Sequence, residues 1–146
     1  MKFPYRRYSV TPTPAQLGET VISRPIIRFR LHCDSESALF WGLLDTGADE
    51  TYITKEMADA LGIVASESFG IESASGRMTA SYATVHLEVS DDTEQYQWPS
   101  VIGVIDQPWS EAILGHAGFL RYFDVTFLGK SSEVILQRNE LAFQSS

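Results

Sequence analysis

The 146-residue sequence has one cysteine, Cys33, and little basic charge. A single cysteine excludes an internal disulfide framework and does not by itself suggest metal or thiol chemistry, so we expect Cys33 to be a small buried hydrophobic residue. Lysine and arginine total 11 against 19 aspartates and glutamates, which gives a net charge of -8. Because no broad positive field is present to attract phosphate backbones, we expect no nucleic-acid partner.

Long apolar runs and metal-binding spacings are also missing. No stretch of 18 or more apolar residues occurs, and residues 8–20, which follow the basic N-terminal positions, lack the apolar run of a signal peptide. We therefore expect no membrane association and a cytoplasmic location. His32, His86 and His116 share no ligand spacing, and the acidic residues 91–94 lack the glycine of a calcium loop, so we expect no metal and no cofactor.

Enough apolar residues are present, 44% of the chain, to bury a core in one compact domain. Residues 1–22 hold three of the six prolines among scattered polar residues. This composition predicts an extended N-terminal arm over 1–22 rather than packed regular structure, and a folded domain over 23–146.

Apolar periodicity predicts short strands along most of that domain. In Ile26–His32 apolar and polar residues alternate, as in a half-exposed strand, whereas the continuous apolar run Ala38–Leu44 predicts a strand buried on both faces. A hairpin is expected with arms at Phe69–Glu72 and Met78–Val89 and its tip at Ser73–Arg77. The other expected strands are Val101–Ile105, Ala112–Gly115, Asp124–Phe127 and Glu133–Gln137.

Two short helices are expected between these strands. Thr54 is a suitable N-cap for the first, which ends near Gly62, and His116–Phe123 fits the second. Many short strands with two short helices indicate a β-rich domain.

The stretch GLLDTGADETYI, Gly42 to Ile53, places an acid directly after an apolar run. Burying an acidic side chain there costs free energy unless its carboxylate takes part in a reaction or accepts hydrogen bonds. The tripeptide Asp45-Thr46-Gly47 is weak evidence alone. Here, however, Ala48 and Asp49 follow it, a flap-like hairpin comes next, and the apolar stretch ILGHAGFL occurs further along the chain.

Together these motifs resemble those of the retropepsin-like aspartic proteases, the family of the retroviral proteases and their cellular and bacterial relatives. The resemblance covers about Arg24 to Gln137. It implies an all-β dominated, retropepsin-like acid protease fold, a single lobe with one or two short helices that homodimerisation closes.

The same resemblance implies an aspartic endopeptidase. Members of the family hydrolyse peptide bonds with two carboxylates that share one proton and activate a water, without a covalent intermediate. This sequence contains one Asp-Thr-Gly, so the second carboxylate must come from a second copy. We expect an obligate homodimer, with Asp45 of both copies on the twofold axis, acting on a peptide or protein substrate.

Further roles follow only from the resemblance. Thr46 would reach across the twofold axis to the partner's backbone, and Gly47 would let the water approach closely because it has no Cβ. Together with Asp45 these two residues are the expected catalytic set. The expected substrate-binding residues are Ala48, Asp49, Ser73, Ala74, Ser75 and Gly76, and those expected to support the active-site loop are Ile113, Leu114 and Gly115.

Three positions depart from the retroviral pattern. His116 stands where many retroviral members have an arginine paired with the acid matching Asp49, which predicts a weaker, pH-dependent pair. Ala48 lacks the serine hydroxyl that donates to the catalytic acid in other members, so we expect a pH optimum nearer weakly acidic or neutral. The flap tip 73–76 is also poorer in glycine than the retroviral one.

Other readings of the same residues stay open. Asp45 or Asp49 can be a simple turn cap, His116 a polar residue without a catalytic role, and Trp109 a core or cleft-wall residue. At the level of function, the alternative is a catalytically idle retropepsin-like dimerisation or peptide-binding module. A further hypothesis is that the protein removes its own N-terminal arm.

Overall fold

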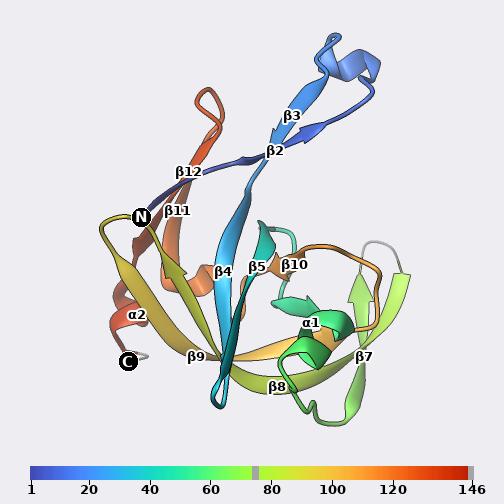
Figure 1. The fold of residues 1–146 in the computed structure, drawn as a ribbon, viewed down its shortest axis with the longest axis vertical. Helices are drawn as coiled ribbons and strands as arrows, with labels where there is room; N and C mark the ends of the chain where they lie inside the picture. Colours follow the sequence, from blue (N-terminus) through green and yellow to red (C-terminus); the bar gives the residue numbers. More distant parts are fainter. Residues whose placement is uncertain (74–75, 145–146) are drawn as a thin grey trace.

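The computed structural model describes residues 1–73 and 76–144 and is mostly β (Figure 1). Its strands are β1 (Lys2–Pro4), β2 (Arg6–Ser9), β3 (Val21–Arg24), β4 (Ile26–Cys33), β5 (Glu36–Leu44), β6 (Tyr52–Thr54), β7 (Ser68–Ser73), β8 (Gly76–Ser90), β9 (Gln95–Ile105), β10 (Ala112–Leu114), β11 (Phe123–Leu128) and β12 (Glu133–Arg138). The helices of the described part are α1 (Lys55–Ala60), α2 (Glu140–Gln144) and two 3-10 turns, η1 (Pro14–Gln16) and η2 (Leu120–Tyr122). The expected β-rich fold with short helices is confirmed.

One seven-stranded sheet forms the body of the protein, in the order β4-β5-β10-β6-β9-β8-β7. Strand β4 also pairs with β8, where Leu31 lies opposite Leu87, so the sheet curls back on itself. Both of these leucines are fully buried. The interior is filled by aliphatic and aromatic side chains, among which Trp98 stacks on Tyr96 with ring centroids 4.8 Å apart.

The helix and hairpin expected after the Asp-Thr-Gly turn are present. Thr54 caps α1, because its Oγ1 accepts a hydrogen bond of 3.2 Å from the Met57 amide, and Gly62 follows the helix with a φ of +64°. Strands β7 and β8 pair from Ser68 opposite Ser81 to Ser73 opposite Gly76. Ala74 and Ser75, at the expected tip, lie outside the described residues.

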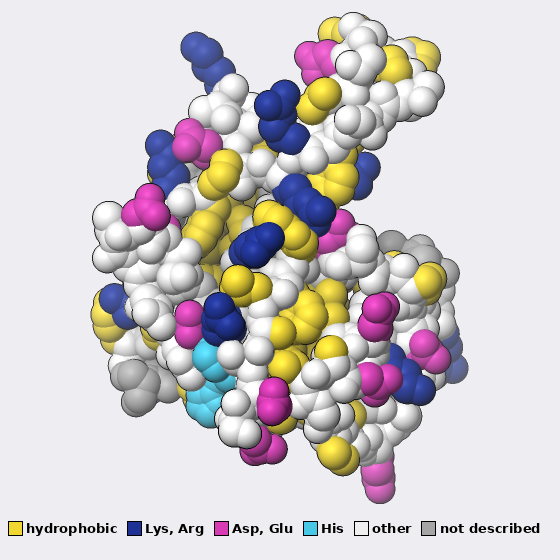
Figure 2. All heavy atoms as spheres, in the orientation of Figure 1, with side chains coloured by type: hydrophobic (Ala, Val, Ile, Leu, Met, Phe, Trp, Pro, Cys, Tyr) yellow, Lys and Arg dark blue, Asp and Glu magenta, His cyan; other side chains and the backbone are white. Residues whose placement is uncertain are grey.

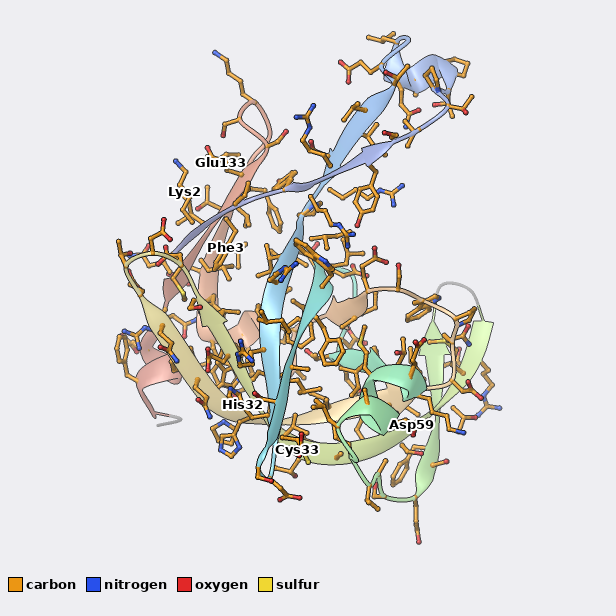
Figure 3. The ribbon with its side chains drawn as sticks, in the orientation of Figure 1. Lys2, Phe3, His32, Cys33, Asp59 and Glu133 are labelled. Carbon is orange, nitrogen blue, oxygen red and sulfur yellow. The ribbon has the colours of Figure 1, made fainter. Side chains whose placement is uncertain are left out.

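The N-terminal residues are more structured than the sequence indicates. Strand β1 pairs with β12 in a three-stranded sheet with β11, and Phe3, opposite Val134, is only 8% exposed. Lys2 and Glu133 lie side by side on this sheet, with their charged groups 3.5 Å apart (Figure 3). Strands β2 and β3 form a separate two-stranded hairpin that projects from the body (Figure 1). The division into an arm and a domain near residue 22 stays a prediction.

The apolar sequence of β5 predicts a strand that is buried on both faces, and the structure contradicts this prediction. Leu39 is 47% exposed and Trp41 is half-buried, so one face of β5 is only partly covered. Arginine side chains lie over Trp41. Cys33, expected to be buried, is half-buried and packs against the edge of the core.

The prediction of a helix over 116–123 is also wrong, because only the short 3-10 turn η2 is helical there. The amides of His116 and Ala117 donate to Ala48 and Asp49 carbonyl oxygens, so this segment continues alongside the Asp-Thr-Gly turn instead of coiling. Gly118 then adopts a φ of +93°, which breaks any helix started there. Only the last turn, η2, remains helical.

Candidate functional site

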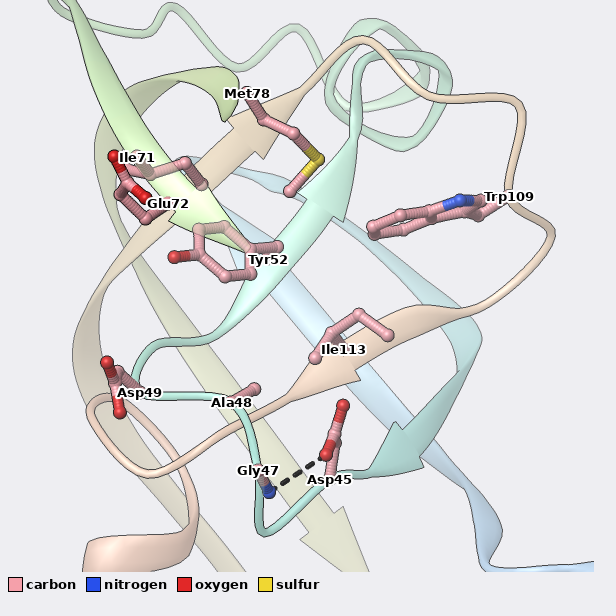
Figure 4. A pocket seen from close by; sticks show the side chains of 10 residues that line it. All are labelled: Asp45, Gly47, Ala48, Asp49, Tyr52, Ile71, Glu72, Met78, Trp109 and Ile113. Carbon is pink, nitrogen blue, oxygen red and sulfur yellow. Dashed lines mark hydrogen bonds between the residues drawn. The ribbon is translucent and has the colours of Figure 1, made fainter. Parts of the chain in front are cut away.

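Asp45 lies at the point where β5 ends and the chain turns sharply. Its amide donates a hydrogen bond of 3.1 Å to the Leu114 carbonyl, and its carboxylate accepts one of 2.9 Å from the Gly47 amide (Figure 4). The Ala48 amide closes the turn by donating to the Asp45 carbonyl. The turn thus fixes the carboxylate, and Asp45 remains half-exposed while Thr46 and Gly47 are exposed.

Strand β10 supports this turn from the side. It lies parallel to β5, with Ile113 opposite Leu43 and Leu114 opposite Leu44. Next comes Gly115, where an added Cβ would meet the Glu50 carbonyl oxygen and lie 2.7 Å from the Ala48 carbonyl oxygen. Only glycine fits this close approach. The three residues expected to support the active-site loop are therefore all beside the turn.

A pocket of about 330 Å³ opens in front of Asp45 (Figure 4). Its lining comes from the Asp-Thr-Gly turn, β6, both flap strands, the loop before β10 and β10 itself. The lining residues are Asp45, Gly47, Ala48, Asp49, Tyr52, Ile71, Glu72, Met78, Trp109 and Ile113. Apolar side chains and three carboxylates share this lining, which suits an apolar side chain attached to a polar backbone.

The expected substrate-binding residues divide into two groups. Ala48 and Asp49 line the pocket, and Asp49 is exposed. Gly76 belongs to flap strand β8 but is not among the described lining residues, and the flap strands contribute Ile71, Glu72 and Met78 to the lining.

The expected pair between His116 and Asp49 is absent. Among the described residues no ion pair joins them, and His116 is linked to the turn through its backbone amide, which donates to the Ala48 carbonyl over 2.9 Å. The arginine of the retroviral pattern is therefore not replaced by an equivalent side-chain contact here.

Sequence reasoning missed a hydrogen-bonded cluster around Glu50. Its Oε2 accepts hydrogen bonds from the hydroxyl groups of Tyr52, at 2.9 Å, and Tyr82, at 2.6 Å. Burial and this hydrogen bond raise the pKa of Tyr82 to about 12, and the pKa of Tyr52 is raised further for the same reasons. Both tyrosines stay neutral donors, so Glu50 ties the Asp-Thr-Gly turn to β6 and to flap strand β8.

Local sequence does signal this cluster weakly. Glu50 directly follows the turn, and Tyr52 is two residues further along the same extended segment. Tyr82 is distant in sequence, and no pattern points to it.

Neither a metal centre nor a membrane-spanning helix occurs in the described part of the chain. No three His, Cys, Asp or Glu side chains there are close enough to hold a metal ion. Within residues 1–73 and 76–144, no helix has the length and apolar character needed to cross a membrane.

Comparison with known proteins identifies similar sequences and folds. Residues 40–121 match the family model of the gag-polyprotein putative aspartyl proteases. A retropepsin-like aspartic protease from Rickettsia conorii is similar in structure, with a TM-score of 0.51 and 18% identity over 76% of this chain and 80% of that one. The EIAV protease in complex with an inhibitor gives a TM-score of 0.48 and 22% identity over 64% and 83%. No curated protein sequence matches the chain. The Rickettsia conorii structure supports the fold.

Proposed function

Because the chain belongs to the family of the gag-polyprotein putative aspartyl proteases, we propose that it is an aspartic endopeptidase active as a homodimer. One observation carries the proposal: Asp45 stands on a turn that its neighbours hold by hydrogen bonds, and its carboxylate lines a pocket of about 330 Å³ with both apolar and acidic side chains. A carboxylate that only capped a turn would not need an adjoining cavity.

The chemistry requires a second carboxylate, which a second copy supplies. The exposed Thr46 and Gly47 leave the turn accessible to a partner. When the two Asp45 side chains meet on a twofold axis, two like charges cannot both ionise, so one carboxyl keeps its proton and the pair titrates as a unit.

In the proposed reaction a water molecule lies between the two carboxyl groups. The ionised Asp45 removes a proton from the water, whose oxygen attacks the peptide carbonyl carbon, while the protonated Asp45 gives its proton to the carbonyl oxygen. As the resulting diol collapses, one of its hydroxyl groups gives a proton to the ionised carboxylate, the C–N bond breaks, and the protonated Asp45 gives its proton to the leaving nitrogen, which restores the starting pair. Both products leave without a covalent intermediate.

The substrate would bind as an extended peptide between the turn and the flap. Strands β7 and β8 lie over the pocket and contribute Ile71, Glu72 and Met78 to its wall. A peptide in this position can form backbone hydrogen bonds as an added strand, while one of its side chains fills the pocket. We expect that side chain to be apolar, because Ile71, Met78, Trp109 and Ile113 surround it.

The test is cleavage of a mixed peptide library, read by mass spectrometry, over a range of protein concentrations. Asp45→Asn should abolish cleavage, with a loss of at least about a thousandfold, and the specific activity of the unmodified protein should rise with concentration as dimers form. Asp92→Asn is a matched control, because Asp92 also precedes a threonine but lies in an exposed turn; it should cleave normally.

If the unmodified protein forms dimers but cleaves nothing at any concentration, the proposal fails. The chain is then better described as the catalytically idle dimerisation or peptide-binding module, and peptide binding to the folded dimer becomes the activity to measure.

A further inference from the structure

The β2–β3 hairpin stands apart from both other sheets. It pairs only with itself, from Arg6 opposite Arg24 to Ser9 opposite Val21, and projects from the body (Figure 1). Arg6 and Tyr8 are two residues apart on β2, so they lie on one face of the hairpin. That face is directed at the body, as the contacts of these two side chains show.

Alternating arginine and aromatic side chains join the hairpin to β5. The Trp41 ring lies between two guanidinium groups, with the Arg6 carbon Cζ 4.3 Å and the Arg28 Cζ 4.7 Å from its centroid. Arg6 and Arg24 also lie near the Tyr8 ring, at 5.2 Å and 5.0 Å. Figure 2 shows basic side chains gathered where the hairpin meets the body. Such contacts favour one fixed position of the hairpin on β5.

The same face of the hairpin holds Glu111. The Tyr8 hydroxyl donates a hydrogen bond of 2.9 Å to Glu111 Oε1, and the Arg6 guanidinium lies 4.0 Å from that oxygen. Ser110 donates to the other oxygen over 2.7 Å. Burial favours the neutral acid, but the hydrogen bonds from Ser110 and Tyr8 and the charges of Arg6 and Arg24 outweigh it and lower the pKa of Glu111. The group is therefore an ionised acceptor at neutral pH.

Glu111 is the anchor of the loop that carries Trp109. This loop, residues 106–111, joins β9 to β10, and among the described residues its side-chain hydrogen bonds and ion pairs with other elements all involve Glu111. Trp109 lines the pocket and also a second hollow of about 300 Å³, together with Phe40 and Met57. Because two hollows border the half-buried indole, it is only partly packed by neighbouring side chains.

We propose that the β2–β3 hairpin is a positioning element of the substrate pocket, which holds Glu111 through Tyr8 and Arg6 and thereby keeps Trp109 in the pocket wall. Its effect on turnover rests on the proposed protease function. Its effect on Trp109 does not, and the experiment below separates the two.

The test compares Tyr8→Phe with the unmodified protein. The substitution removes only the hydroxyl and keeps the ring beside Arg6 and Arg24. Fluorine NMR of protein labelled with 5-fluorotryptophan, with the Trp109 signal assigned by Trp109→Phe, should show that signal shifted or broadened. Hydrogen exchange in 106–111 should be at least about threefold faster, as expected for loss of a hydrogen bond to a charged group. The KM for a cleaved peptide should rise about fivefold, with kcat changed less than about twofold.

Two further variants control the experiment. Tyr5→Phe removes a hydroxyl between β1 and β2 that forms no hydrogen bond with the described residues, and it should leave the Trp109 signal and KM unchanged. Glu111→Gln keeps an oxygen that Tyr8 can donate to but loses the attraction to Arg6, so it should give an intermediate effect.

An unchanged Trp109 signal together with unchanged loop exchange in Tyr8→Phe would falsify the proposal. A changed signal with an unchanged KM would also overturn it, since Trp109 would then not act in substrate binding. If the unmodified protein cleaves no peptide, the protease function fails, and the NMR and exchange results still decide whether the hairpin positions Trp109.

Discussion

At the scale of single residues, Gly115 is a glycine with no room for a side chain beside the Asp-Thr-Gly turn. It follows β10 and passes directly against the backbone of the Asp-Thr-Gly turn, where an added Cβ would meet the carbonyl oxygens of Glu50 and Ala48. Both oxygens belong to backbone, which cannot move aside without shifting the turn that carries Asp45. The glycine therefore determines how closely β10 can support the turn.

Gly115→Ala should destabilise the protein by about 3 kcal/mol, at the upper end of the cost of overpacking a well-packed site. Urea unfolding followed by circular dichroism measures the change. Gly129→Ala is the matched control, because nothing lies within 4 Å of its added Cβ, and it should change stability by less than about 0.5 kcal/mol. Equal unfolding midpoints for the two variants would contradict the close approach at Gly115.

At the scale of elements, the turn between β8 and β9 is fastened by Asp91. Its carboxylate accepts hydrogen bonds from the backbone amides of Thr93, Glu94 and, from β1, Lys2, at 2.9, 2.8 and 3.0 Å. These hydrogen bonds, of which the one from the Thr93 amide has the largest effect, hold the pKa of Asp91 well below its usual value of 3.8. The sequence indicates only a solvated acidic turn, whereas the structure shows a turn that also holds the N-terminal strand.

This arrangement predicts a pH-dependent loss of stability. The folded protein prefers ionised Asp91, so its contribution is present above pH 3.8 and disappears as the pH falls below that value toward the lower pKa of the folded state. Asp91→Asn should be less stable than the unmodified protein at pH 7, and the difference should shrink between pH 5 and about pH 2. Urea unfolding over this range measures it. Asp92→Asn should show no such trend, and a constant difference for Asp91→Asn would refute the prediction.

At the scale of the whole molecule, the two ends of the chain are packed together. Strand β1 pairs with β12 beside β11, and Phe3 joins the same buried cluster as Val134 and Leu136. The hypothesis that the protein removes its own N-terminal arm therefore carries a cost, since cleavage near residue 22 would detach a buried strand. Mass spectrometry of active protein decides this by showing whether the N-terminus is intact.

Phe3→Ala tests whether the first strand contributes to the folded unit. Loss of this buried ring should destabilise the protein by about 3 kcal/mol, measured by thermal or urea unfolding. Leu17→Ala, at a position 89% exposed near η1, should be neutral within about 0.5 kcal/mol. If both variants were equally stable, residues 1–4 would have to be regarded as a detached arm after all.

Much of the fold follows from local sequence patterns, and the errors have physical causes. The alternation in β4 and the cap and glycine around α1 predict those elements because each pattern reports on adjacent residues. The apolar run of β5 is misleading, since the Trp41 side chain is half-buried beneath the arginine side chains of Arg6 and Arg28. Likewise, the sequence of 116–123 has a helical pattern. The amides of its first two residues instead donate hydrogen bonds to the carbonyl oxygens of Ala48 and Asp49.

The sequence by itself determined the turn of Asp45, Thr46 and Gly47, because a sharp turn depends on a few neighbouring residue types. Only the tertiary structure decided which side chains form the pocket and where the N-terminal hairpin binds. Trp109 and Met78 reach the pocket from different elements, and Tyr8 and Glu111 are 103 positions apart. Contacts at such separations arise from packing of the whole chain, which no local pattern encodes.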